Sequence, residues 1–165
     1  MLNVRTAESA KRDPNGTVFI SYRRDDGTLC ANKIGALLRA AGLRVWRDIY
    51  NMPARKMQET LERVLGKETS AGVIIVTPNT GQSDMMINLE VPMLLSLAND
   101  PDFPLVIANT VQKLEGGIDY DAPDRYLKID AKTLSDINQF NGSNKDGITK
   151  LVSEMLNSRI QYIVE

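Results

Sequence analysis

Histidine is absent from this 165-residue chain, and cysteine occurs only once. Without histidine, neither a Ser-His-Asp triad nor a Cys-His pair can be built, and the usual zinc sites are also excluded. The single cysteine, Cys30, excludes an internal disulfide and a metal site of several cysteines. It falls at an apolar position of a predicted helix, which favours a buried thiol. Any chemistry must therefore use carboxylates, arginine, lysine, tyrosine or backbone groups, and we expect no bound metal.

The chain also lacks an excess of one charge and a long apolar run. Lysine and arginine number 20 against 21 aspartates and glutamates, which gives a formal net charge of -1. This balance argues against general binding of nucleic acid or membrane. The longest apolar stretch, residues 85–98, is interrupted by Asn88, Glu90 and Pro92 and is no convincing membrane span. The first 16 residues have no apolar core typical of a signal peptide, so we expect a cytoplasmic protein.

Strand and helix patterns alternate along the chain. We expect residues 1–16 to be a flexible lead-in and residues 17–165 to form one domain. Apolar, β-branched runs predict strands at 17–22, 43–46, 71–78, 103–109 and 125–130. Between them, 3.6-residue periodicity predicts helices, and a further helix follows around residues 148–156. This alternation predicts a parallel sheet with helices on both faces.

Two helix ends carry specific signals. Gly42 stands where a C-cap glycine belongs, just after the apolar stripe of the first predicted helix. Ser83 or Asp84 is suited to cap the helix that follows the third strand and extends to about Ala98. Within that helix, Pro92 removes a backbone donor, which predicts a bend.

Polar and aromatic side chains gather where the first two strands end. The first strand ends at Tyr22, Arg23 and Arg24, and the second ends at Trp46, Arg47 and Asp48. In open parallel sheets, ligands bind beyond the carboxyl ends of the strands. These residues are therefore candidates for a binding site, although charged residues after a strand more often form a solvated loop.

Glu90 is the most informative ionisable residue. It is the only ionisable side chain between Asp84 and Asp100, and its helical neighbours are apolar. A carboxylate on such a face requires a partner or an altered pKa, because burying an unpaired charge is costly. Glu90 is either a functional carboxylate or one that pairs with an arginine or reaches solvent.

The segments "VFISYRRDD", "LLRAAGLRVWRD" and "AGVIIVTP", with an acidic residue in the next helix, resemble a Toll/interleukin-1 receptor (TIR) domain. The resemblance covers roughly residues 17–160. It implies a flavodoxin-like three-layer sandwich with a five-stranded parallel sheet. Many bacterial and plant members of the family cleave NAD⁺ with a glutamate in the helix after the third strand, and Glu90 aligns with it. The family often has Ser-x-Trp-Cys-x-x-Glu there, whereas this chain has Asp84 and Met86 in place of the serine and the tryptophan.

The resemblance implies NAD⁺ as substrate rather than cofactor. Glu90 would then be the catalytic carboxylate of an NAD⁺ glycohydrolase or cyclase. Tyr22 or Trp46 would present an aromatic face to a base, and Arg23 or Arg24 would meet the diphosphate. Ser21 and Asp48 would contact a ribose.

The resemblance also implies self-association. Residues 48–56 would be a loop that joins copies of the domain into a homo-oligomer or filament, with Tyr50, Pro53, Arg55 and Lys56 as candidate contacts. In bacteria, such domains are often fused to, or encoded beside, a sensor of nucleotide signals in antiphage defence. The main alternative is a TIR–TIR interaction module without catalysis. A phospho-acceptor regulator fits poorly because the third strand ends in Thr77-Pro78, and a nucleoside deoxyribosyltransferase is disfavoured by the paired arginines, which suit a diphosphate better.

Overall fold

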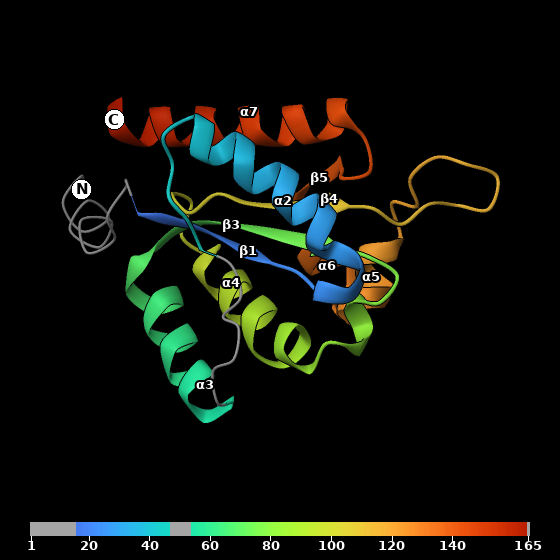
Figure 1. Ribbon diagram of the computed structural model, residues 1–165, viewed down its shortest axis with the longest axis horizontal. Coiled ribbons are helices and arrows are strands. Elements are labelled where there is room, and N and C mark those ends of the chain that lie inside the picture. Colours follow the sequence, from blue (N-terminus) through green and yellow to red (C-terminus); the bar gives the residue numbers. More distant parts are fainter. Residues whose placement is uncertain (1–15, 47–53, 165) are drawn as a thin grey trace.

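A parallel sheet of five strands forms the centre of the protein, in the order β2-β1-β3-β4-β5 (Figure 1). The computed structural model describes residues 16–46 and 54–164, with the backbone alone described for 54–58, 67 and 159–164. The strands are β1 (Thr17–Ser21), β2 (Val45–Trp46), β3 (Thr69–Val76), β4 (Leu105–Asn109) and β5 (Asn138–Asn141). All four pairings are parallel, which confirms the predicted flavodoxin-like fold.

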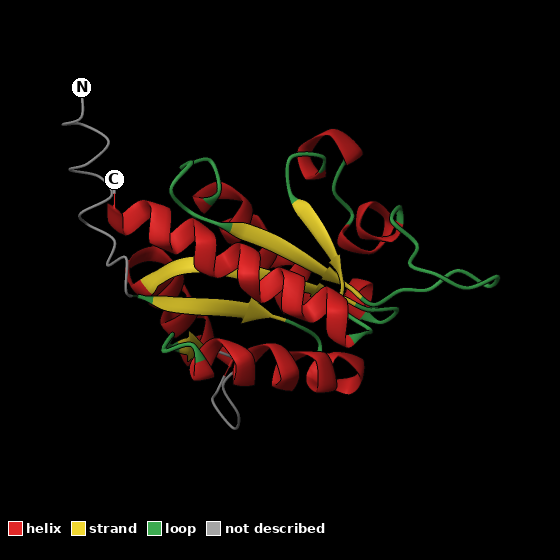
Figure 2. Cartoon of the chain, turned by 90° about the horizontal axis from the view of Figure 1, so that it is seen from above, coloured by secondary structure: helices red, strands yellow, loops and turns green. Residues whose placement is uncertain are grey.

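Helices cover both faces of this sheet. On one face, α2 (Arg24–Ala40) packs beside α7 (Lys145–Val164), and Figure 2 shows both helices running across the strands. The other face carries α3 (Ala54–Arg63), η1 (Val64–Glu68), η3 (Met86–Glu90), α4 (Val91–Leu97), α5 (Ala122–Leu127) and α6 (Ala131–Leu134). A short 3₁₀ turn, η2 (Thr80–Gln82), follows β3. The protein is therefore a three-layer sandwich.

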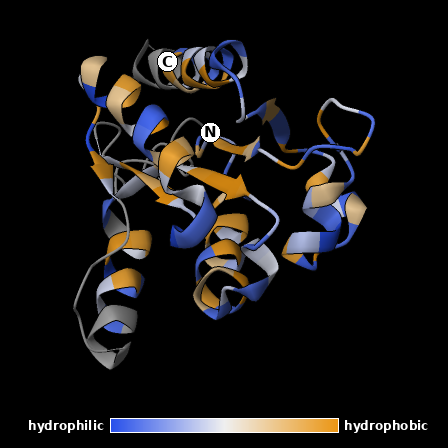
Figure 3. Ribbon diagram, turned by 45° about the vertical axis from the view of Figure 1, so that its right-hand side comes forward, coloured by the Kyte–Doolittle hydropathy of each residue, from blue (hydrophilic) through white to orange (hydrophobic). Residues whose placement is uncertain are grey.

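The apolar core is divided by the sheet into two clusters. Every residue of β3 is buried, as expected for a central strand covered on both faces. Along β1, Val18 and Ile20 pack toward α2 and α7, whereas Phe19 packs toward α3 and α4. Figure 3 shows the central strands coloured as hydrophobic segments. The alternation along β1 decides which polar residues at its end share a face.

The end of α2 confirms the role predicted for Gly42. Its φ of +89° lies in the left-handed region, which glycine enters without a Cβ clash. The N–H of Gly42 donates to the carbonyl of Arg39, and the N–H of Leu43 donates to the carbonyl of Leu38. These two bonds form a Schellman motif, which turns the chain sharply from α2 into β2.

The prediction of a strand at residues 125–130 is wrong. Residues 122–127 form α5, which Pro123 helps to start and which ends at Lys128, with φ of 58°. Leu127 is buried against the α3/α4 face, so its apolar character reflects helix packing. The fifth strand is β5, whose sequence is Asn-Gln-Phe-Asn. It carries little apolar signal because it is an edge strand, which pairs only with β4 and tolerates polar residues.

Candidate active site

Ser21 and Glu90 meet at the carboxyl end of β1. The Ser21 Oγ donates a hydrogen bond of 2.6 Å to the Glu90 Oε1. Ser21 is fully buried, and the exposed fraction of Glu90 is 8%. Because Ser21 lies two residues after Phe19 on β1, its side chain faces α3 and α4, the face on which Glu90 lies. A buried carboxylate is thus held at the end of the strand where a ligand is expected.

A π-helical turn carries Glu90. It spans Met86–Glu90, and the N–H of Val91 donates across it to the carbonyl of Met86. The Ser83 Oγ accepts a hydrogen bond of 3.3 Å from the N–H of Met86, which confirms Ser83 as a cap of this helical segment. Pro92 follows directly, so the interruption predicted there takes the form of a π turn. Turns of this kind occur frequently at functional sites.

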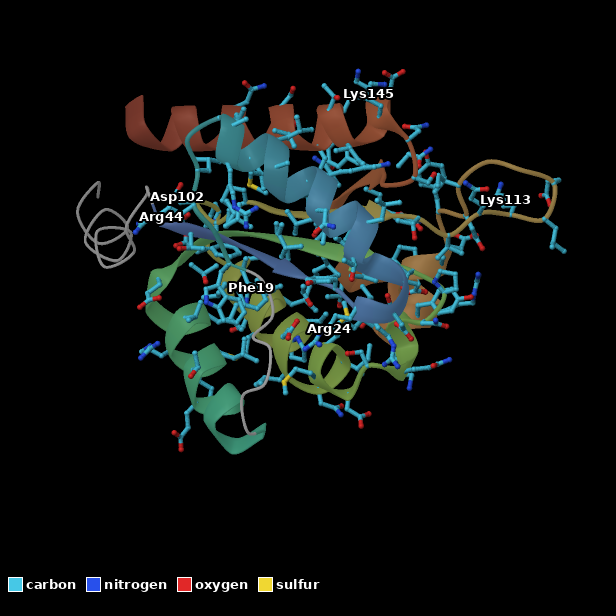
Figure 4. The ribbon with its side chains drawn as sticks, viewed as in Figure 1. Phe19, Arg24, Arg44, Asp102, Lys113 and Lys145 are labelled. Carbon is cyan, nitrogen blue, oxygen red and sulfur yellow. The ribbon has the colours of Figure 1, made fainter. Side chains whose placement is uncertain are left out.

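Trp46 lies next to this pair. Its ring stacks on Phe19 with centroids 5.0 Å apart and an interplanar angle of 10°. Trp46 is half-buried, and Phe19 is opposite it in the β1–β2 register. Because Ser21 is two residues further along β1, the stack lies roughly 7 Å from it along the strand. Trp46 therefore borders the face on which Glu90 is held, and Figure 4 labels Phe19 on this side of the sheet.

Tyr22 lies on the other face of the sheet. Only 6% of it is exposed, and it belongs to the core cluster of α2 and α7 together with Cys30 and Ala31. A Cβ added to Gly27 would lie 3.3 Å from the Cβ of Tyr22, so this small residue makes room for the ring. The structure does not bring Tyr22 together with Glu90, because successive side chains of a strand point to opposite faces.

The arginines and aspartates after β1 form the start of α2. Arg23 precedes the helix, and its Nε donates to Asp25 Oδ1 at 2.9 Å. Arg24 is the first residue of α2 and is exposed. Figure 4 labels it at this end of the helix. Asp25 and Asp26 lie in the first turn, where carboxylates suit the positive end of the helix dipole. A diphosphate at this helix end has to compete with these two carboxylates.

Asp26 has a structural role that sequence reasoning missed. Its Oδ1 accepts a hydrogen bond of 2.5 Å from the Thr77 Oγ1, and its Oδ2 accepts one of 3.0 Å from the N–H of Asn79. The Thr80 Oγ1 in turn accepts a hydrogen bond of 2.8 Å from the N–H of Thr77. Asp26 thus ties the first turn of α2 to the end of β3. The only sequence signal was Asp-Asp after a strand, which does not identify a partner.

Part of the predicted site lies outside the described residues. This applies to Asp48, Tyr50 and Pro53. Arg55 and Lys56 lie in the first turn of α3, which begins at Ala54. Residues 54–56 of the predicted loop 48–56 therefore belong to α3, whose strongly amphipathic sequence favours a helix.

The described part of the chain contains neither a cluster of metal-binding side chains nor a helix that could span a membrane. Within residues 16–46 and 54–164, no group of three or more cysteine, aspartate or glutamate side chains is arranged to hold a metal ion. No helix in those same ranges is both long and apolar enough to cross a membrane.

Comparison with known proteins agrees with this architecture. A family model described as TIR domain matches residues 18–152. The chain belongs to the TIR domain family. The match includes β1 except for its first residue, the π turn with Glu90, the other four strands and the first part of α7. No relative was found among curated proteins.

Solved structures extend the comparison at low sequence identity. The TIR domains of the activated Roq1 resistosome, which directly recognizes the pathogen effector XopQ, superpose with a TM-score of 0.57 at 16% identity. That match covers 86% of this chain and 98% of the other. A metazoan TIR-STING receptor from C. gigas matches with a TM-score of 0.43 at 18% identity, covering 55% of this chain and 30% of the receptor. The Roq1 match supports the shared TIR fold.

Proposed function

We propose that this TIR domain cleaves NAD⁺ at the bond between nicotinamide and ribose, with Glu90 as the essential carboxylate. The observation that carries the proposal is the buried Glu90 held by Ser21 at the carboxyl end of β1. Membership in the TIR family supports it, since the family resemblance implies a glutamate at this place in the helix after the third strand. A chain without histidine is suited to this reaction, which needs little acid catalysis.

The chemistry needs a negative charge beside the ribose. As the C1′–N1 bond breaks, its electron pair goes to the pyridinium nitrogen and nicotinamide leaves neutral. Positive charge then develops on C1′ and the ring oxygen, as in glycoside hydrolysis. Glu90 stabilises this cation and positions the ribose hydroxyls. Water adds to C1′ and releases a proton, so that NAD⁺ and water give ADP-ribose, nicotinamide and H⁺. In the cyclase variant, a nucleophilic atom of the substrate takes the place of water.

The other predicted site residues take supporting roles in this proposal. Ser21 orients the Glu90 carboxylate through its 2.6 Å hydrogen bond. Trp46 provides the aromatic surface, because its half-buried ring lies on the Glu90 side of the sheet. Arg23, which also pairs with Asp25, and Arg24 both stay candidates for the diphosphate. Asp48 stays a candidate ribose contact. We assign no substrate contact to Tyr22, which fills the opposite core.

We further propose that activity depends on self-assembly through residues 48–56, and that the domain acts as an effector in antiphage defence. The support is the family resemblance: members are often active only when stacked, and in bacteria they accompany a sensor of nucleotide signals. Turnover per molecule should then rise with protein concentration.

The decisive experiment measures nicotinamide release from NAD⁺ at high protein concentration. A preorganised charge is typically worth about 10²–10³ in rate, so Glu90→Gln should lose at least that much. The glutamine amide oxygen can still accept the Ser21 hydrogen bond, which preserves the fold. Glu68→Gln, at an exposed residue on the opposite end of β3, is the matched control and should keep full activity. Wild-type release by Glu90→Gln would refute the assignment.

A second candidate is a TIR–TIR interaction module without catalysis. It is favoured by large apolar side chains on the surface, of which Leu29 and Leu114 are 67% and 106% exposed. In that case Glu90 is a buried polar residue that Ser21 satisfies. The same assay separates the two functions, because an interaction module releases no nicotinamide at any protein concentration.

A further inference from the structure

Asp26 connects two loops that border the candidate active site. One loop follows β1 and leads into α2, and the other, residues 77–83, follows β3 and leads into the π turn with Glu90. β1 and β3 are neighbours in the sheet, but their loops lead to helices on opposite faces. In parallel sheets of this order, ligands bind in the crevice between two such loops. Figure 1 shows the first turn of α2 beside the loop that follows β3.

Hydrogen bonds join the two sides of this crevice on both faces of the sheet. On the α4 face, the Ser21 hydroxyl donates to the Glu90 carboxylate. On the α2 face, the two carboxylate oxygens of Asp26 accept from the buried Thr77 hydroxyl and from the N–H of Asn79. Asp26 therefore fixes the start of the loop after β3 against the first turn of α2.

A series of hydrogen bonds leads from this point to the π turn. The Thr80 hydroxyl accepts from the N–H of Thr77, and the N–H of Ser83 donates to the Thr80 carbonyl at 3.0 Å. The Ser83 hydroxyl then accepts from the N–H of Met86, the first residue of the π turn. A displacement of the loop is therefore passed on to the turn that carries the proposed catalytic carboxylate.

The loop is also confined on its other side, by α5. A Cβ added to Gly81 would lie 3.3 Å from the carbonyl oxygen of Tyr126, so the two backbones are close. Asp26 and α5 thus hold the loop between them, and removal of the Asp26 carboxylate releases it on the α2 side.

We infer that Asp26 is a positioning residue for Glu90: by fixing residues 77–83, it keeps the Glu90 carboxylate where Ser21 binds it. The inference rests on the proposed role of Glu90 in NAD⁺ cleavage and adds a residue that acts without touching the substrate. Such a role matters because a misplacement of about 1 Å can reduce a rate by roughly 10². Asp26 acts through its contacts, so its negative charge is not required.

The first test compares Asp26→Ala with Asp130→Ala. Asp130 is a matched control because it also accepts from a backbone N–H and a threonine hydroxyl, both of Thr133, but at the start of α6. We expect Asp26→Ala to lower kcat for nicotinamide release roughly tenfold and to change KM less than about twofold, since only the position of the catalytic group is affected. Asp130→Ala should keep the wild-type kcat, although it loses a helix cap. An equal loss of kcat in both variants would overturn the inference.

Asp26→Asn separates the contacts of Asp26 from its charge. The amide oxygen can accept from the N–H of Asn79 and the amide nitrogen can donate to the Thr77 hydroxyl, so both contacts persist without the charge. This variant should therefore retain most of the wild-type kcat. An asparagine variant as slow as Asp26→Ala would show that the charge is what matters, which contradicts a positioning role.

Unfolding measurements test the inference without the reaction. If Asp26 holds Glu90 in place, the hydrogen bond from Ser21 is weaker in Asp26→Ala than in wild type. Ser21→Ala raises the unfolding equilibrium constant by a factor that should be at least about threefold smaller in the Asp26→Ala background than in wild type. In the Asp130→Ala background this factor should be unchanged.

The unfolding cycle also keeps the inference apart from the proposed function. If wild type releases no nicotinamide, NAD⁺ cleavage is refuted, whereas the cycle still decides whether Asp26 positions Glu90. A factor for Ser21→Ala that is equal or larger without Asp26 overturns the inference. If Asp26→Ala does not fold, Thr77→Val, which removes one of its two partners, replaces it in both measurements.

Discussion

Ser21 Oγ lies 2.6 Å from Glu90 Oε1, although the two residues are 69 positions apart in the sequence. The contact joins the carboxyl end of β1 to the π turn that follows β3, the neighbour of β1 in the sheet. A hydrogen bond to a charged group inside a protein is worth about 1.5–3 kcal/mol, and its loss leaves an under-satisfied buried carboxylate. The same bond that stabilises the fold therefore orients the proposed catalytic group.

Replacing Ser21 by alanine tests both effects of this hydrogen bond, its contribution to stability and its orientation of Glu90. We expect Ser21→Ala to lower the free energy of unfolding by about 1–3 kcal/mol and to reduce nicotinamide release by roughly tenfold, because the carboxylate loses its orienting donor. Ser21→Thr keeps the hydroxyl and should retain most of the activity. Urea unfolding and the nicotinamide assay measure the two quantities. Equal activity of the alanine and threonine variants would show that Ser21 does not position Glu90.

Asp26 and Asp25 offer a matched pair at the start of α2. Asp26 accepts from both Thr77 and Asn79, whereas Asp25 forms an exposed ion pair with Arg23. We expect Asp26→Ala to lower the free energy of unfolding by about 1–3 kcal/mol, since it leaves the buried Thr77 hydroxyl without this acceptor. Asp25→Ala should cost less than about 1 kcal/mol, as exposed ion pairs usually do. Chemical denaturation of both variants is the measurement, and equal losses would contradict the bridging role of Asp26.

β5 and Leu127 show where sequence patterns fail to predict the structure. Strands β1, β3 and β4 were predictable because buried parallel strands are continuous apolar runs. β2, at the other edge of the sheet, was indicated only by its short apolar sequence. β5 was not, since an edge strand such as Asn138–Asn141 pairs with only one neighbour and tolerates polar residues. Leu127, in contrast, suggested a strand but packs from a helix. Periodicity alone cannot separate the two in so short a run.

The candidate site was predictable to the extent that its residues follow strand ends. Glu90 stood out as a lone charge in an apolar helix, whereas Ser21, near the end of the first predicted strand, was only a candidate ribose contact. Their direct contact depends on the π turn, which no local sequence pattern specifies, and on the tertiary packing of α4. Tyr22 was misleading for a simple reason: neighbouring residues on a strand face opposite sides, and only one of Ser21 and Tyr22 can share a face with Glu90.

Cys30 provides a prediction about pH. Burial raises the pKa of its thiol from 9.0 to about 11, because the core does not solvate a thiolate, and Lys33 offsets only part of this effect. Between these values the unfolded chain releases the thiol proton but the native protein keeps it. The stability contributed by the neutral thiol is therefore complete below pH 9 and is lost as the pH rises toward 11.

The measurement is urea unfolding at several pH values for wild type and Cys30→Ala. Over this range wild type should lose roughly 2–3 kcal/mol more than the alanine variant, in which this ionisation is absent. Thiol reagents should also modify the native protein far more slowly than the unfolded chain at pH 8, since the thiolate is the reactive form. Parallel pH profiles for the two proteins would contradict the prediction.

Gly147 tests the junction between β5 and α7, where the sequence prediction was weakest. A Cβ at this position would overlap the backbone oxygen of Asn141 and lie 2.7 Å from its carbonyl carbon, so backbone rather than a flexible side chain would have to move. The N–H of Gly147 also donates to Asn144 Oδ1 at 2.8 Å, which fixes the start of α7. We expect Gly147→Ala to lower the free energy of unfolding by more than about 2 kcal/mol.

Gly66→Ala is the control, because an added Cβ there meets nothing within 4 Å and glycine is a poor helix former. This variant should be neutral or should stabilise the protein by up to about 1 kcal/mol. Thermal and urea unfolding of both variants measure this difference. Similar stabilities of the two variants would contradict the prediction, because they would mean that α7 can shift away from β5 without cost and that β5 is held by pairing with β4 alone.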